Sequence, residues 1–140
     1  LALYARHLGW LHAVPEKRDK PRCHYFDKED PFFTLPELGA VEYIAHLWLR
    51  CGKCKSGAMS VVALDWVDVA SMSKFVPIDS IEAESIITMS REYCAGLSLK
   101  SHNDRAPYDK GDYSDEDWLA RERTMEASFQ LGEDMKKTAR

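Results

Sequence analysis

Two cysteines three positions apart are the residues of this sequence best suited to chemistry. Cys51 and Cys54 have the Cys-x-x-Cys spacing that can grip one zinc ion, and the adjacent Cys23 and His24 offer two further ligands. Structural zinc sites normally use two spaced pairs, however, and neighbouring residues seldom share an ion comfortably. A redox role would require a preceding strand in a βαβ unit, which the sequence does not indicate. We interpret the four cysteines, which include Cys94, as reduced thiols, and we keep a small zinc-stabilised binding module as an alternative.

The other reactive side chains form no recognisable catalytic constellation. The five histidines are scattered, and none lies beside a serine or cysteine in a nucleophile motif. The pairs Asp65/Asp68 and Glu82/Glu84 are typical of helix faces and first turns, where carboxylates serve capping and solubility. The glycines are isolated and build no phosphate-binding loop. We therefore predict that the protein is not an enzyme and holds no cofactor and no metal.

The elements that must position any site are helical by their apolar spacing. This spacing predicts an all-α fold, a small bundle of about four packed helices with a looser C-terminal helix. The helix that we expect to begin at Ser60 is rich in β-branched residues and could also be a buried strand, but Asp65 and Asp68 at helical spacing favour a helix. The next begins with Asp79 and Glu82 in capping-box spacing. The predicted helices are residues 1–14, 34–52, 60–75, 79–97 and 114–140.

The predicted domain organisation is a helical domain followed by a C-terminal extension. The domain covers residues 1–100 and contains a solvated loop at 15–33, which is rich in charges of both signs and in prolines. Residues 101–113 form a polar linker, and residues 114–140 form an amphipathic helix with a narrow apolar seam. Because large aromatic side chains most often anchor a core, we expect Trp48 and Trp66 to be buried.

Composition disfavours two classes of partner. The 140 residues carry a net charge of -4 and have a pI near 5.7, so the chain lacks the basic footprint of a nucleic-acid-binding protein. The longest uncharged apolar run, residues 57–64, is far shorter than the roughly 20 residues of a membrane-spanning helix. We expect binding to neither nucleic acid nor membrane.

Residues 38–108 resemble a family of small proteins from tailed bacteriophages, the tail assembly chaperones and related minor tail proteins. Members read as a helix, a glycine-containing link, a second helix, a breaker, and a helix with the pattern Trp-Glu, apolar pair, Met or Leu, Ser-Arg, any, Tyr. This chain has Ile81-Glu82, Ile86-Ile87 and Met89-Ser90-Arg91-Glu92-Tyr93 at those positions. Ile81 replaces the usual tryptophan, and Ala63 stands where an acidic residue is customary.

The resemblance implies a non-enzymatic chaperone that keeps the tape measure protein soluble and brings tail tube subunits to it. Amphipathic partner helices would lie against the two helices that begin at Ser60 and Asp79. The expected location is the host cytoplasm during assembly, or the virion tail if the chain is instead a structural minor tail subunit. Self-association is a further expectation. The residues expected to bind partners are Trp66, Val67, Ile86, Ile87, Tyr93, Trp118 and Phe129.

Overall fold

The computed structural model describes residues 1–26, 28–101 and 104–108, together with four single positions, 116, 120, 123 and 127. The chain divides into two compact units, Leu1–Lys110 and Gly111–Arg140. The four described positions of the second unit are helical. The remainder of the predicted C-terminal helix, including Trp118 and Phe129, lies outside the described residues.

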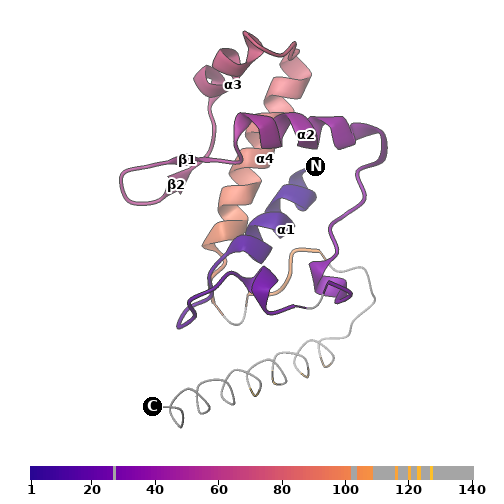
Figure 1. The fold of residues 1–140 in the computed structure, drawn as a ribbon, viewed down its shortest axis with the longest axis vertical. Helices are drawn as coiled ribbons and strands as arrows, with labels where there is room; N and C mark the ends of the chain where they lie inside the picture. The colour runs from indigo at the N-terminus through magenta and orange to yellow at the C-terminus, as the bar shows by residue number, and fades with distance from the viewer. Residues whose placement is uncertain are drawn as a thin grey trace. The chain divides into compact units, whose positions relative to one another are not determined.

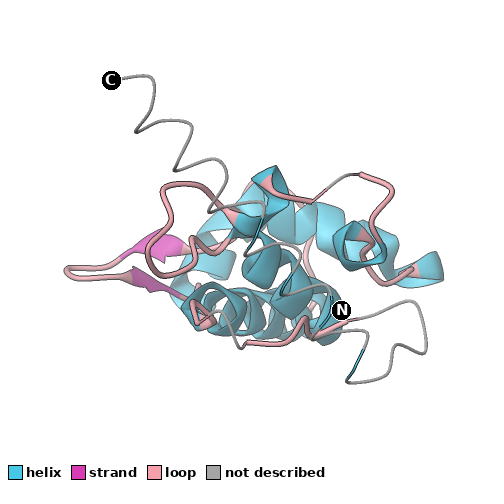
Figure 2. Cartoon of the chain, turned by 90° about the horizontal axis from the view of Figure 1, so that it is seen from below, coloured by secondary structure: helices cyan, strands magenta, loops and turns pink. Residues whose placement is uncertain are grey.

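The first unit is predominantly helical and carries a small antiparallel sheet of two short strands (Figure 1, Figure 2). The prediction of a mainly helical protein is therefore confirmed. The sheet was not predicted, and it pairs Lys55 with Val62 and Ser56 with Val61. The helices are α1 (Ala2–His12), α2 (Glu42–Cys51), α3 (Trp66–Ser73) and α4 (Ser80–Ser98), with the 3-10 turns η1 (Arg22–His24), η2 (Pro31–Phe33) and η3 (Gly39–Val41), and the strands are β1 (Lys55–Ser56) and β2 (Val61–Val62).

Helix α4 is the central element of the unit, and its start is the one predicted. The Asp79 carboxylate accepts a hydrogen bond from the Glu82 backbone N–H at 2.8 Å, and the Glu82 carboxylate accepts one from the Asp79 N–H at 2.9 Å. This capping box satisfies two amides that the first turn of a helix leaves unpaired. The face of α4 that enters the core comprises Ala83, Ile86, Ile87, Met89, Ser90, Tyr93 and Gly96.

The segment predicted as one helix from Ser60 to Phe75 is a strand followed by a shorter helix. Val61 and Val62 lie in β2, and the hairpin turn is closed by the Gly57 N–H, which donates to the Ser60 carbonyl at 2.7 Å. The prediction of a cap at Ser60 was wrong because the β-branched pair extends and pairs with β1. The helix begins only at Trp66.

The helix predicted over residues 34–52 is also shorter in the structure. The chain after Thr34 contains no α-helical residue until Glu42, and the first turn before it is η3. Pro36 therefore lies outside the helix, in the segment between Thr34 and η3. Gly52 ends α2 with a positive φ of 86°, a backbone conformation that suits glycine and agrees with the predicted stop.

Helices α1 and α4 approach each other closely at two glycines. The Cα of Gly9 faces Gly96, and a Cβ added at Gly96 would lie 2.8 Å from the backbone nitrogen of Trp10 and against the carbonyl oxygen of Arg6. Beside this crossing, the Arg6 Nε donates to the Glu92 carboxylate at 2.5 Å. Any side chain at either glycine would push the two backbones apart.

The charged loop 15–33 is packed on the helices, although we predicted that it would be solvated. Arg22 within it is only 6% exposed. Its guanidinium donates to the carbonyls of Trp10 at 3.1 Å, Leu99 at 2.5 Å and Ser101 at 3.0 Å, and lies over the Trp10 ring. The Leu99 carbonyl at the end of α4 and the Trp10 carbonyl in the last turn of α1, which also accepts from the Ala13 N–H at 3.3 Å, thus share one cation, and the partial negative charge of helix C-termini favours it.

The beginning of the predicted linker 101–113 is packed on α1 as well. The Trp10 indole N–H donates to the Asp104 carbonyl at 3.0 Å, and Ala106 is 9% exposed. His7 is fully buried; its Nδ1 accepts from the Tyr108 backbone N–H at 3.2 Å. Residues 104–108 therefore belong to the helical unit, because their backbone supplies partners for polar groups buried on α1.

Candidate partner-binding surface

Helix α3 is fixed at its first turn by a cluster of charges. The Asp65 side chain accepts from the backbone amides of Val67 at 2.9 Å and Asp68 at 3.1 Å, while the Asp68 carboxylate accepts from the Asp65 N–H at 2.8 Å. Lys55 of β1 donates to both carboxylates at 2.7 Å. The hydrogen bond from Lys55 is the main reason that the pKa of Asp65 falls to about 2. The hairpin and the helix are thereby joined.

A buried serine of α4 holds the chain on both sides of the hairpin. Ser90 is fully buried, and its hydroxyl accepts from the Leu64 backbone N–H at 2.8 Å and donates to the Lys53 carbonyl at 2.8 Å. The Lys53 carbonyl also accepts from the Trp48 indole N–H at 3.2 Å. Together with the burial of Val69, these bonds determine which face of α3 points towards α4.

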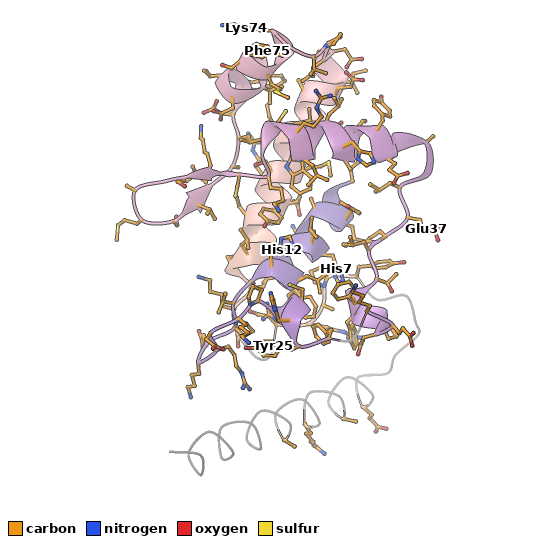
Figure 3. All side chains as sticks on the ribbon, viewed as in Figure 1. His7, His12, Tyr25, Glu37, Lys74 and Phe75 are labelled. Carbon is orange, nitrogen blue, oxygen red and sulfur yellow. The ribbon has the colours of Figure 1, made fainter. Side chains whose placement is uncertain are left out.

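The opposite face of α3 presents large apolar side chains to solvent. Trp66 is 56% exposed, Val67 is 73% exposed and Phe75, just beyond the end of the helix, is 84% exposed. Phe75 and its neighbour Lys74 lie at one extremity of the drawn unit (Figure 3). We call Trp66, Val67 and Phe75 the α3 surface. Trp66 and Val67 lie in the first turn of α3, and Phe75 follows the last helical residue, Ser73, by two positions.

Further apolar side chains are exposed around the hairpin and on α4. Met59 at the hairpin turn is fully exposed, Val61 and Val62 are 43% and 40% exposed, and Ile81 in the first turn of α4 is 73% exposed. Single exposed apolar residues are ordinary on protein surfaces. A tryptophan, a phenylalanine and several valines on one hairpin and helix are a stronger indication of a contact surface.

Several predicted partner-binding residues lie in the core instead. Ile86, Ile87 and Tyr93 are 0%, 3% and 5% exposed, so a partner cannot contact them while the unit is folded. They face inward because α4 is covered by α1 on one side and by α2 on another, which leaves little of its apolar stripe free. Trp66, expected in the core, is outside it, whereas Trp48 is fully buried as predicted. Among the predicted partner-binding residues that the structure describes, Trp66 and Val67 remain accessible.

Tyr93 is the centre of a polar contact within the core. Its hydroxyl forms a 2.8 Å hydrogen bond with the His12 Nδ1, and its ring packs edge-on against Trp48. Burial raises the pKa of Tyr93 to about 12, so the phenol is protonated at neutral pH. Burial, reinforced by the charge of Lys53, lowers the pKa of His12. A neutral histidine hydrogen-bonded to a protonated phenol is a structural pairing here, not an activated nucleophile.

The residues proposed as zinc ligands do not assemble into a metal site. Among the residues that the structure describes, no group of three or more His, Cys, Asp or Glu side chains is arranged to hold a metal ion. The four cysteines are free and partly exposed.

Two shallow clefts in the first unit are open to solvent. One, of about 410 Å³, lies between α1, α2 and residues 35–39, and the other, of about 300 Å³, lies beside Ile81. Within the described residues, no helix has the length and apolar character needed to cross a membrane.

Comparison with known proteins gives no relative: no family model, curated protein or solved structure matches the chain. The α3 surface is therefore identified from the exposure and contacts of its residues.

The sequence patterns missed two residues of this region. Phe75 was assigned to the end of a helix that faces inward, and Lys55 lay in a segment predicted to connect two helices. The spacing of Asp65 and Asp68 carried a usable signal, since three residues apart is also the spacing of a capping box.

Proposed function

We propose that this chain is a non-enzymatic protein-binding protein that holds an apolar partner segment on the α3 surface. The observation that carries the proposal is the exposure of Trp66 and Val67 on α3 and of Phe75 just beyond it, while Lys55 and Ser90 anchor the start of the helix. A rigidly held helix that presents an indole and a phenyl ring has the side chains that most often dominate binding energy at interfaces. We also propose that α1, α2 and α4 act as a small bundle that supports α3.

We propose that this chain is a phage tail assembly protein of the chaperone type. Its partner is an amphipathic helix of another tail protein. The residue pattern of 38–108, which resembles that of tail assembly chaperones, supports this class, with the tape measure protein and the tail tube protein as proposed partners. Exposed apolar side chains on α3 and directly after it suit contact with the apolar face of a partner helix, whose residues are spaced i, i+3, i+4 and i+7. Release before the tail is complete requires only a modest contact area, which three large side chains and the hairpin provide.

Co-expression with tagged tape measure and tail tube proteins tests the proposal. The Trp66→Ser/Val67→Ser variant should lose most of the co-purifying partner, because both anchors are removed and neither supports the core. Leu3→Ser is the matched control, since Leu3 is 45% exposed on α1 and should not affect capture. Circular dichroism of both variants establishes that they are folded.

Two outcomes would count against the proposal. Equal capture by wild type and the double variant would show that the α3 surface is not the contact site. Mass spectrometry of mature tails provides the second test: a chaperone is absent from them, whereas a fixed copy number would identify a structural tail subunit. Binding to neither tail protein would remove the support for the phage assignment.

A further inference from the structure

The larger of the two clefts lies where α1, α2 and residues 35–39 meet, at the end of α2 away from the hairpin (Figure 1). Its volume of about 410 Å³ falls within the range of roughly 300–1,000 Å³ that is usual for binding pockets. One side of α2 lines the cleft, with residues spaced i, i+3, i+4 and i+7, and these are Glu42, Ala45, His46 and Leu49. Tyr4 of α1 lines it as well.

The floor and the rim of the cleft are defined by the fold. Ala45 is 3% exposed and belongs to the hydrophobic core, so it forms a packed floor. At the rim, Gly39 has a positive φ of 53°, a backbone conformation that suits glycine. The Val41 N–H then donates to the Leu38 carbonyl at 3.2 Å. These features set the path of the chain from residues 35–39 into α2.

Two carboxylates and a phenol provide the main polar groups of the cleft. Glu37 lies on the segment before α2 (Figure 3), and Glu42 lies in the first turn of the helix. Burial and the charge of Glu42 raise the pKa of Tyr4, so the phenol is protonated at neutral pH. The His46 Nε2 is 3.8 Å from the Glu42 Oε1, which is too far for a hydrogen bond. The imidazole therefore does not occupy a hydrogen-bond position on that oxygen.

The charge of the cleft favours a cation. Glu37 and Glu42 each carry one negative charge at pH 7. The N-terminus of α2 opposes them with only about half a positive charge. Beside the carboxylates, the cleft is lined by the apolar side chains of Leu35, Leu38 and Leu49. A complementary ligand therefore carries a positive charge at the end of an aliphatic stem.

We propose that this cleft binds the side chain of a lysine or arginine that belongs to a partner protein. The stem lies along Leu38 and Leu49, and the cationic group lies between Glu37 and Glu42. Long basic side chains cover apolar surface with their stems while the charged group stays near water, which suits a cleft that is open to solvent. The same openness disfavours a free small molecule, because small-molecule sites bury roughly 70–90% of the ligand surface.

NMR titration of the isotope-labelled full chain with Nα-acetyl-lysine N-methylamide tests this proposal. We expect saturable shifts of the Gly39, Glu42 and His46 amide signals but not of Trp66, with a dissociation constant on the order of 1 mM. The arginine analogue should shift the same signals. The norleucine analogue has an aliphatic stem without the charge. It should bind roughly 25-fold more weakly, because each of two ion pairs at about 4 Å in water contributes about fivefold.

Glutamine variants identify the groups that hold the cation. Glu37→Gln and Glu42→Gln should each weaken binding of the lysine probe about fivefold, and the double variant about 25-fold. Glu84→Gln is the matched control, because Glu84 is exposed on α4 and lies outside this cleft. The Trp66→Ser/Val67→Ser variant should bind the probe like the wild type, so the result is independent of the function proposed for the α3 surface. The amide spectra show whether each variant is folded.

Three outcomes would overturn the proposal. One is an absence of saturable shifts at the cleft with the lysine and arginine probes. Another is equal affinity for the lysine and norleucine probes, or an unchanged affinity in the double glutamine variant. The third is micromolar binding of putrescine, roughly a thousandfold tighter than that of the lysine probe, which would identify a free diamine as the occupant.

Discussion

Alanine at Gly96 tests the close crossing of α1 and α4. The new methyl group would lie 2.8 Å from the Trp10 nitrogen and 3.0 Å from the Gly9 carbonyl carbon, and in hard contact with the Arg6 carbonyl oxygen. Ordinary contacts at a Cβ are at least 3.4 Å. All three neighbours are backbone atoms, so no side-chain rotation can relieve the overlap. The two helices must separate instead.

The expected loss of stability follows from two opposing terms. Overpacking of this kind costs about 3 kcal/mol, at the upper end of the usual range, because helix backbones must move. Replacing glycine by alanine inside a helix returns about 1 kcal/mol through the lower entropy of the unfolded chain. We therefore expect Gly96→Ala to reduce the free energy of unfolding by about 2 kcal/mol and to lower the melting temperature by roughly 8 °C.

Urea unfolding followed by circular dichroism measures this change. Thr88→Ala is the matched control, because Thr88 is exposed on the same helix and alanine there should stabilise slightly through helix propensity. Gly9→Ala should be destabilising for the same reason as Gly96→Ala, and the double variant should cost less than the sum, since helices already separated admit the second methyl group. A Gly96→Ala protein as stable as wild type would refute the close crossing.

Three further changes probe polar contacts of the first unit. Arg22→Met should cost about 3 kcal/mol of unfolding free energy in urea titration, because it leaves the carbonyls of Trp10, Leu99 and Ser101 without a shared donor, and Arg22→Lys should recover only part of it. The pKa of His12 is lowered in the folded state, so below about pH 6.5 the unfolded chain binds more protons and the free energy of unfolding falls. His12→Gln should therefore lessen the decline of the urea midpoint between about pH 7.5 and 5.5. An unchanged decline would show that His12 is not its cause. The Asp65 pKa of about 2 implies a contribution to folding stability that is present above about pH 4 and lost as the pH falls towards 2. Lys55→Met should therefore reduce the fall in melting temperature over this pH range. A fall in melting temperature equal to that of the wild type would show that Lys55 is not its cause.

Helix α4 could be predicted from sequence because everything that defines it is local. Asp79 and Glu82 cap each other within one turn, and the stripe through Ile86 and Tyr93 is unbroken. The segment from Ser60 could not be assigned in the same way. Val61 and Val62 suit a strand or a helix, and the choice depends on pairing with Lys55 and Ser56, which no local pattern specifies.

The candidate site shows the same division between local and distant causes. Trp66 and Val67 were named as partner-binding residues, yet their exposure depends on which side of α3 is held by Val69 and by the Ser90 hydroxyl. The burial of Ile86 depends on its cover by other helices. Apolar periodicity identifies an apolar face, but it does not distinguish a face covered by the same chain from one left for a partner.

Arg22 has a consequence for the order in which this unit can fold. Its guanidinium meets carbonyls 12 residues earlier in the chain and 77 and 79 residues later. The Arg22 guanidinium therefore gains its Leu99 and Ser101 acceptors only after α4 has docked beside α1, and contacts of such long sequence separation form late and slowly. The loop and the segment after Leu99 should consequently open as one cooperative unit, with amides in both exchanging hydrogen at a common rate while the α1 and α4 crossing stays closed.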